Sequence, residues 1–217
     1  MKSILFAAVM ACTISLLTTQ TALAKTLKVE LNIEAVHCME PSRHSVDQED
    51  QLIILVRGQS PKEDYMKRLP ADDNYYRGMK NVHLTQSGWP DRHNKKNEKP
   101  ILWRGNLREG QTAKFFVVLA AQQSRELAVV SQDLAHFWGT KQITSYVEEN
   151  KHDVLGSFTV IMKNVAGELQ VTWNAGDYTR HSVGDGNAKP FGLDAAFFGL
   201  GGPSEASYNM IANAIVK

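Results

Sequence analysis

Acidic residues precede two of the apolar segments of this chain, and they are the residues best suited to hold a metal ion. Asp47, Glu49 and Asp50 stand just before one segment, and Asp153 opens a later one. Calcium takes about six to eight oxygen ligands, which converging loops can supply. The sequence therefore predicts a candidate calcium site of four residues, with solvated acidic turns as the alternative: Asp47, Glu49, Asp50 and Asp153.

Histidine and aspartate residues suggest a second chemistry, in which a general base works beside a carboxylate. His152 and Asp153 are adjacent, and Asp177 and His181 share one glycine-containing loop. The chain has no G-x-S-x-G, S-x-x-K, G-x-x-x-x-G-K or H-E-x-x-H motif. The alternative function is therefore a hydrolase with a noncontiguous site, made of His152, Asp153, Asp177 and His181.

One polar segment combines cations with indole rings. Trp89, Arg92, Lys95 and Lys96 lie close together, and Trp103 follows shortly after them. Cations flanked by aromatic rings can hold an anionic sugar polymer or lipid headgroups. These five residues are a candidate ligand-binding surface, and a solvated loop is the alternative.

The N-terminal segment has the features of a leader. Lys2 supplies the positive start, an apolar stretch follows, and Ala22-Leu23-Ala24 gives a small-residue cleavage site. A lipoprotein-type box ending at Cys12 fits less well, because Met10 is a poor match. We therefore expect a cleavable signal peptide over residues 1–24, a single domain over residues 25–217, and a secreted or periplasmic protein.

Composition excludes several classes of partner. With 24 Lys and Arg against 23 Asp and Glu, the chain has no field to gather nucleic acid or anionic lipid. No later apolar run approaches the roughly 20 residues of a transmembrane helix. Cys38 is the only thiol after the leader, so we expect a buried thiol and no intramolecular disulfide.

Hydrophobic periodicity predicts a mainly β fold. Residues 27–34 alternate between apolar and polar, as in a half-buried strand. Leu52–Val56 and Ala113–Ala121 are continuous apolar runs, typical of strands covered on both faces. Residues 164–167 suggest a hairpin turn between two further strands, and the segment over residues 206–216 fits a closing strand better than a helix.

The remaining segments are less regular. Apolar residues at spacings of three and four predict a helical insertion over about residues 126–149. Residues 59–100 are polar and read as irregular, apart from a short strand near Val82–Leu84. Residues 184–202 are rich in glycine, and Phe191–Leu200 could cover an open end or form an exposed patch. The expected fold is an antiparallel β-sandwich with one inserted α-helix.

Four short pieces resemble C2-like β-sandwich domains. An acidic loop, Asp47–Asp50, leads into an apolar strand, and His152–Phe158 opens another; Trp103–Gly105 and the strand around Phe115 fall between them. The resemblance implies a C2-like sandwich with calcium held by loops at one rim. It departs from the calcium-binding members at Gln122-Gln123-Ser124, where paired aspartates are expected.

These observations predict a non-enzymatic binding or interaction protein. A neutral exported sandwich with long loops and no recognisable catalytic set commonly carries its function in those loops. The expected partner is a protein or a glycan, with calcium as the candidate cofactor. A hydrolase and a purely structural envelope component are the alternatives.

Overall fold

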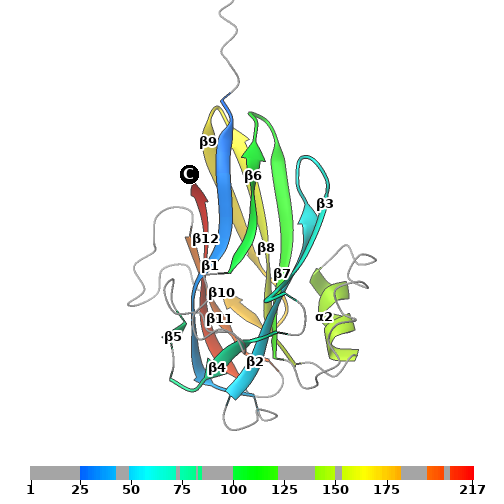
Figure 1. Ribbon diagram of the computed structural model, residues 1–217, viewed down its shortest axis with the longest axis vertical. Coiled ribbons are helices and arrows are strands. Elements are labelled where there is room, and N and C mark those ends of the chain that lie inside the picture. Colours follow the sequence, from blue (N-terminus) through cyan, green and yellow to red (C-terminus); the bar gives the residue numbers. More distant parts are fainter. Residues whose placement is uncertain are drawn as a thin grey trace, which may run out of the picture.

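The chain forms two antiparallel sheets that pack face to face, with one helix beside them (Figure 1). The computed structural model describes residues 25–42, 49–71, 74–81, 83–84, 100–121, 140–149, 153–181, 195–202 and 206–217. Within these residues no helix is long and apolar enough to cross a membrane.

Six strands form each sheet in the described part of the chain. The first sheet, sheet A, contains β1 (Leu27–Glu40), β5 (His83–Leu84), β6 (Ile101–Leu107), β10 (Thr179–His181), β11 (Ala195–Leu200) and β12 (Ser207–Val216). The second, sheet B, contains β2 (Glu49–Gln59), β3 (Asp64–Leu69), β4 (Tyr76–Met79), β7 (Thr112–Ala121), β8 (Asp153–Val165) and β9 (Glu168–Ala175). The helix is α2 (Thr140–Glu149).

The strand order of each sheet follows from its pairings. Sheet A runs β10-β11-β12-β1-β5, and β6 pairs with the opposite half of the same edge of β1. Sheet B runs β3-β2-β7-β8-β9, and β4 extends the edge that β2 shares with β3. We call the end where β1 finishes and β2, β8 and β12 begin the lower rim, which lies at the bottom in Figure 1.

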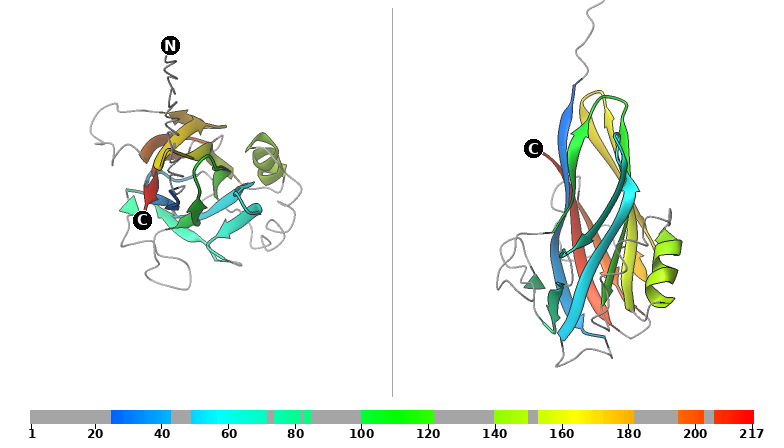
Figure 2. Two further views of the ribbon diagram at one scale, coloured as in Figure 1. Left: turned by 90° about the horizontal axis from the view of Figure 1, so that it is seen from above. Right: turned by 45° about the vertical axis from the view of Figure 1, so that its right-hand side comes forward.

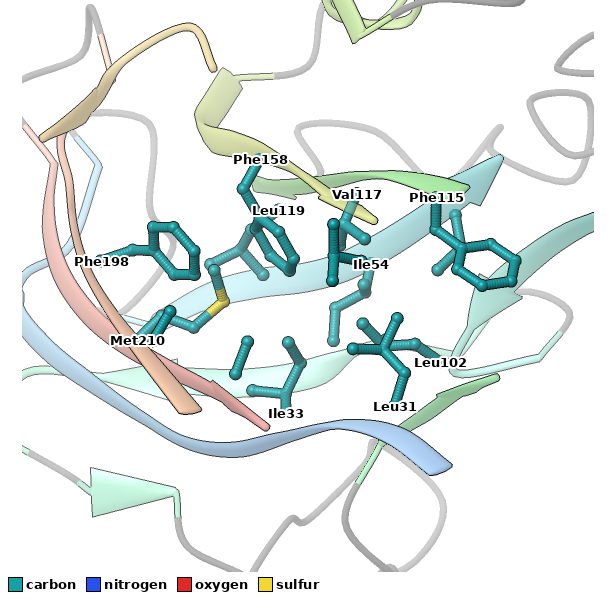
Figure 3. Close-up of a cluster of buried hydrophobic side chains, with 14 of the residues drawn as sticks. Leu31, Ile33, Ile54, Leu102, Phe115, Val117, Leu119, Phe158, Phe198 and Met210 are labelled. Atoms are coloured by element: carbon teal, nitrogen blue, oxygen red, sulfur yellow. The ribbon is translucent and has the colours of Figure 1, made fainter. Parts of the chain in front are cut away.

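Alternating side chains from both sheets make the core between them. Figure 3 shows Leu31, Ile33 and Met210 of sheet A facing Ile54 and Val117 of sheet B. All of these side chains are buried. This confirms the predicted period of two in β1, since its core residues recur at every second position.

Aromatic rings fill the part of the core between β8, β9 and β11. Phe158 stacks on Phe198 with ring centroids 4.6 Å apart, and Trp173 lies 5.8 Å from Phe158. Phe158 belongs to sheet B and Phe198 to sheet A, so the stack joins the two sheets. Such pairs add about 0.5–1.5 kcal/mol beyond the area that they bury.

The helix explains why the central strands are apolar on both faces. Ile143 and Val147, one turn apart on α2, pack against the outer-facing residues Ile53, Leu55 and Val118 of β2 and β7. The sequence predicted these strands to be covered on both faces, and that is confirmed. The right-hand view of Figure 2 shows α2 alongside the lower half of sheet B.

A single buried amide ties the upper end together. The Asn164 side chain donates to the carbonyls of Lys25 and Leu107, at 2.7 and 2.8 Å, and accepts from the backbone N–H of Gly167 at 2.9 Å. Both N–H donors of this amide and one acceptor position of its oxygen are therefore used within the protein. Lys25, the first residue after the predicted cleavage site, is held in place by this contact.

Two side chains of β3 close one edge of the sandwich. The Tyr65 hydroxyl donates to the Leu102 carbonyl at 2.6 Å, and Lys67 Nζ donates to the Ile101 carbonyl at 2.7 Å. Burial raises the pKa of Tyr65 to about 12, and burial together with the nearby Arg104 lowers the pKa of Lys67. Sheet B is thus bonded to sheet A directly along this edge.

The structure corrects the reading of two segments. Residues 59–100 were expected to be irregular, but β3 and β4 lie within them; the polar side chains of Lys67 and Arg68 on β3 bond to backbone carbonyls within the fold. The glycine-rich segment contains β11, whose Ala196, Phe198 and Leu200 are buried in the core. The predicted helix is confirmed over Thr140–Glu149, and residues 126–139 lie outside the described residues.

Candidate functional site

A tight turn at the lower half of the molecule carries the chain from sheet B to sheet A. It comprises Gly176, Asp177 and Tyr178, between β9 and β10. A Cβ on Gly176 would lie 2.2 Å from Ser157 Oγ, so any other residue there would force the buried Ser157 side chain to move. Tyr178 has φ of 56°, a left-handed conformation that a bulky residue rarely adopts.

Hydrogen bonds hold this turn against β8 and against Gly201, the residue that follows β11. The backbone N–H of Ser157 donates to the Asp177 carbonyl at 3.1 Å and to Thr179 Oγ1 at 2.8 Å, and Gly176 N–H donates to the Ser157 carbonyl at 2.8 Å. Gly201 N–H donates to the Tyr178 carbonyl at 3.0 Å. Together these hydrogen bonds fix the backbone of the turn, and they hold Tyr178 in its strained left-handed conformation.

A small polar pocket lies between this turn and α2. We call it the rim pocket; its volume is about 250 Å³, and it is lined by Lys141, Thr144, Ser145, Glu148, Asp177 and Tyr178. The four helical residues recur at spacings of three and four, which places them on one face of α2. The opposite face of the helix packs on sheet B through Ile143 and Val147. Helix packing therefore fixes the wall of the pocket.

Two hydrogen bonds connect the walls of the rim pocket. Thr144 Oγ1 donates to Asp177 Oδ2 at 2.8 Å. The Tyr178 hydroxyl bonds to Glu148, and this bond is the main cause that raises the pKa of Tyr178. Tyr178 remains 41% exposed, so its ring is fixed at one edge and open to solvent on the rest.

The lining residues define what the rim pocket can recognise. Glu148 and Asp177 offer acceptor oxygens, Lys141 and Ser145 offer donors, and Tyr178 offers a ring face. Two acidic side chains against one basic side chain give the pocket a formal net charge of −1. The site thus suits a ligand rich in hydroxyl groups and without negative charge.

Of the residues predicted for calcium, Glu49 and Asp50 face opposite sides of β2. Glu49 forms a two-pronged ion pair with Arg77 on the outer side, at 2.6 and 2.8 Å. Asp50 is buried on the inner side, where it accepts from Ser42 N–H and Oγ at 2.8 and 2.7 Å and from the Tyr208 hydroxyl. Both oxygens of Asp50 are therefore engaged within the fold.

Asp153 lies at the same end of sheet B as Asp50 but on a different strand. Leu52 pairs with Ala121, which pairs with Asp153, so two strand spacings, about 10 Å, separate β2 from β8. Asp47 lies outside the described residues, and within those no group of three His, Cys, Asp or Glu residues could hold a metal.

The residues predicted for hydrolysis are not brought together where they can be placed. Asp177 binds β8 through Ser157, which is four residues, or about 13 Å of strand, from Asp153. His181 belongs to β10, where it pairs with Phe198, and His152 lies outside the described residues. Asp177 lines the rim pocket, whereas Asp153, the other aspartate of the set, is not among the described lining residues.

The predicted cationic surface can be placed only at Trp103. Its ring lies in the core, 5.3 Å from that of Phe115, and the residue is 5% exposed. Trp103 is therefore wrong as a ligand contact, because its ring has no face open to solvent. Trp89, Arg92, Lys95 and Lys96 lie outside the described residues.

Cys38 is a free, buried thiol, as predicted. It sits opposite Tyr208 in the β1–β12 ladder and next to Asp50, and burial is the main cause that raises its pKa to about 11. A thiol is nucleophilic only as thiolate, so Cys38 is a poor candidate for catalysis.

Raising the pH should therefore destabilise the protein through Cys38. Its pKa rises from 9.0 to about 11 on folding, so the thiol's contribution is complete below pH 9 and is lost as pH approaches 11. Urea unfolding at pH 8, 9.5 and 11 tests this. Cys38→Ala should lose less stability over that interval than the unmodified protein, and an identical pH slope for both would contradict the assignment.

The sequence did not suggest five residues of the rim pocket. They are Lys141, Thr144, Ser145, Glu148 and Tyr178. The available signal was the polar face of the helix at residues 141, 144, 145 and 148, together with an aromatic residue directly after Gly-Asp. The sequence does not show that the polar helix face and the turn lie next to each other, because only the docking of α2 brings them together.

Comparisons with protein-family models, with curated proteins and with solved structures gave no match for this chain. Its function is therefore argued from the geometry of its own residues.

Proposed function

We propose that this is a non-enzymatic carbohydrate-binding protein, and that the rim pocket holds one unit of a neutral glycan. The observation that carries the proposal is Tyr178. Its ring is 41% exposed in a left-handed turn, beside Glu148 and Asp177. Strained residues of this kind persist where a surrounding network holds them, and they cluster at ligand sites.

The chemistry of the rim pocket matches a sugar. Carboxylates accept hydrogen bonds from hydroxyl pairs, while Lys141 and Ser145 can donate to ring and hydroxyl oxygens. The apolar face of a sugar ring can lie on the exposed ring of Tyr178. The volume of about 250 Å³ is below the roughly 300–1,000 Å³ of drug-sized sites, which favours a single small unit of a larger chain.

The pocket is preformed, which favours binding. The turn is bonded to β8 and to Gly201, and the opposing wall is a helix packed on the sheet. A ligand therefore orders few groups when it binds, and less of its interaction energy is lost to conformational entropy.

Binding without catalysis is favoured by how the two carboxylates are engaged. Asp177 accepts from Thr144, and Glu148 bonds to the hydroxyl of Tyr178. Both groups are fixed as acceptors on opposite walls. Asp153, the other carboxylate proposed for a hydrolase, is not among the described residues that line the pocket.

Export by a signal peptide over residues 1–24 belongs to this proposal. Glycans of envelopes and cell surfaces lie outside the cytoplasm, and a free buried thiol with no disulfide partner is compatible with that location. Cleavage after Ala24 would leave the Lys25 carbonyl bonded to Asn164. The C2-like form of the sandwich and the calcium site stay predictions.

Calorimetric titration with a panel of oligosaccharides tests the proposed function. The panel contains neutral chains of glucose, mannose, galactose and N-acetylglucosamine, and anionic chains of uronic acids. We expect saturable binding to at least one neutral chain and weaker binding to every uronate, because the pocket carries net negative charge. Binding of uronates alone, or of no member of the panel, would contradict the proposal.

A further inference from the structure

A bulge near the end of β1 turns Met39 out of the regular ladder. Cys38 pairs with Tyr208 and Glu40 pairs with Ser207, so Met39 is the extra residue between two successive pairs of β1 and β12. Such a bulge re-aims the side chain that it carries. Met39 is 45% exposed, and it is the most exposed methionine in the described part of the chain.

Two polar side chains of β12 donate hydrogen bonds to the Met39 sulfur. Nδ2 of Asn209 lies 3.2 Å from the sulfur, and Oγ of Ser207 lies 3.9 Å from it. A thioether sulfur is only a weak acceptor, so these two donors are matched with a poor partner. Two other described methionines, Met66 and Met79, are 37% and 41% exposed and provide a comparison.

We propose that Met39 is a site of reversible oxidation to methionine sulfoxide, and that Asn209 and Ser207 hold the sulfoxide. The sulfur takes one oxygen atom from hydrogen peroxide, so that an S–O bond forms as the O–O bond breaks. Sulfur loses two electrons, and the leaving hydroxide takes the proton of the transferred oxygen and departs as water. This inference is independent of the proposed glycan site.

The two donors suit the product better than they suit the thioether. Oxidation converts an apolar side chain into a polar one, and this change disrupts a buried core. At Met39 the new oxygen meets solvent and two donors that are already in place. Donors aimed at the position where charge develops also lower the barrier to the reaction. We therefore expect oxidation of Met39 to be fast and to strengthen the link between β1 and β12.

The neighbouring thiol does not compete for the oxidant. Cys38 faces the core, where it is 1% exposed. Burial is the main cause that raises its pKa to about 11, so it is protonated at neutral pH, and the thiolate is the form that reacts. Met39 is thus the accessible sulfur of this adjacent pair.

Peroxide treatment of the purified protein, followed by mass mapping of its peptides, tests the proposal. We expect Met39 to gain one oxygen atom about threefold faster than Met66 or Met79, because one hydrogen bond of ordinary strength changes a rate by about that factor. Asn209→Ala should remove most of this difference. Asn209→Asp, which keeps the size of the side chain but removes its N–H donors, should do the same.

Denaturant unfolding provides a second measurement, made in a variant that carries Met66→Leu and Met79→Leu. In this variant the oxidised form should unfold at a higher denaturant concentration than the reduced form, because the sulfoxide is the better acceptor. Adding Asn209→Ala should abolish that gain. Methionine sulfoxide reductases each act on one epimer of the sulfoxide. Since both donors belong to β12, we expect one epimer to dominate, and one class of reductase to restore most of the thioether.

Several results would overturn the proposal. One is oxidation of Met39 that is no faster than that of Met66 and Met79, or that neither Asn209 variant slows. Another is an oxidised form that unfolds at a lower denaturant concentration than the reduced form while Asn209 and Ser207 are both present. Circular dichroism identifies an Asn209 variant that fails to fold, and Ser207→Ala then replaces it in both measurements, with a smaller loss expected.

Discussion

Tyr178→Ala is expected to weaken glycan binding by about 30-fold, the equivalent of about 2 kcal/mol, because the stacking surface of the rim pocket is lost. The fold should persist, since the turn is held by backbone bonds of Asp177 and Tyr178 that the substitution leaves in place. Titration with the neutral chain that binds the unmodified protein best measures this loss.

Two further substitutions at Tyr178 separate the ring from the backbone. Tyr178→Gly removes the ring but relieves the left-handed conformation, which costs a residue with a Cβ about 1–2 kcal/mol. Tyr178→Gly should bind the glycan as weakly as Tyr178→Ala does. It should unfold at a higher denaturant concentration than Tyr178→Ala. Tyr178→Phe keeps the ring and should retain most of the affinity. Full binding by Tyr178→Gly would show that the ring is not a ligand contact.

Asp50→Ala is expected to destabilise the protein by about 3–5 kcal/mol, because buried donors lose a charged acceptor. Asp50 in sheet B bonds to Tyr208 in sheet A and to Ser42, so it joins the two sheets. Burial, and then the charge of Asp50, raise the pKa of Tyr208, which keeps its hydroxyl protonated as a donor. Chemical denaturation measures the change.

The neighbouring acid provides a matched control for Asp50. Glu49→Ala removes a carboxylate from the same strand, but its partner Arg77 is 47% exposed. Surface pairs of this kind contribute about 0–1 kcal/mol. Asp50→Asn keeps one acceptor oxygen and should fall between the two. If Asp50→Ala and Glu49→Ala lose the same stability, the inner network does not join the sheets as described.

The sequence predicted those elements whose side chains alternate regularly. The core face of β1 is indicated in the sequence by apolar residues at every second position, which are Leu27, Val29, Leu31 and Ile33. The hairpin turn is indicated by Gly167, which has φ of 83°. β3 was missed because its contribution is made by polar groups: the hydroxyl of Tyr65 and the amine of Lys67 bond to β6. Hydrophobic periodicity carries no information about such contacts.

The candidate sites were harder to predict for a different reason. Asp50 reads as a calcium ligand in sequence, but alternation along β2 turns it inward to Tyr208. The sequence predicts that Asp177 works with His181 of its own loop, whereas its partner Thr144 comes from helix α2. The contacts of each of these residues are created by strand pairing or by the docking of α2 on sheet B. A single sequence does not specify either of them.

The central claim is that the rim pocket between α2 and the β9–β10 turn is where a sugar binds. The most direct measurement follows the backbone amide signals of isotope-labelled protein by nuclear magnetic resonance during titration with a neutral oligosaccharide. We predict that the largest shifts occur at Thr144, Ser145, Asp177 and Tyr178. Shifts centred elsewhere, for example on Asn164 at the upper end of the sandwich, with these four signals unchanged, would contradict the claim.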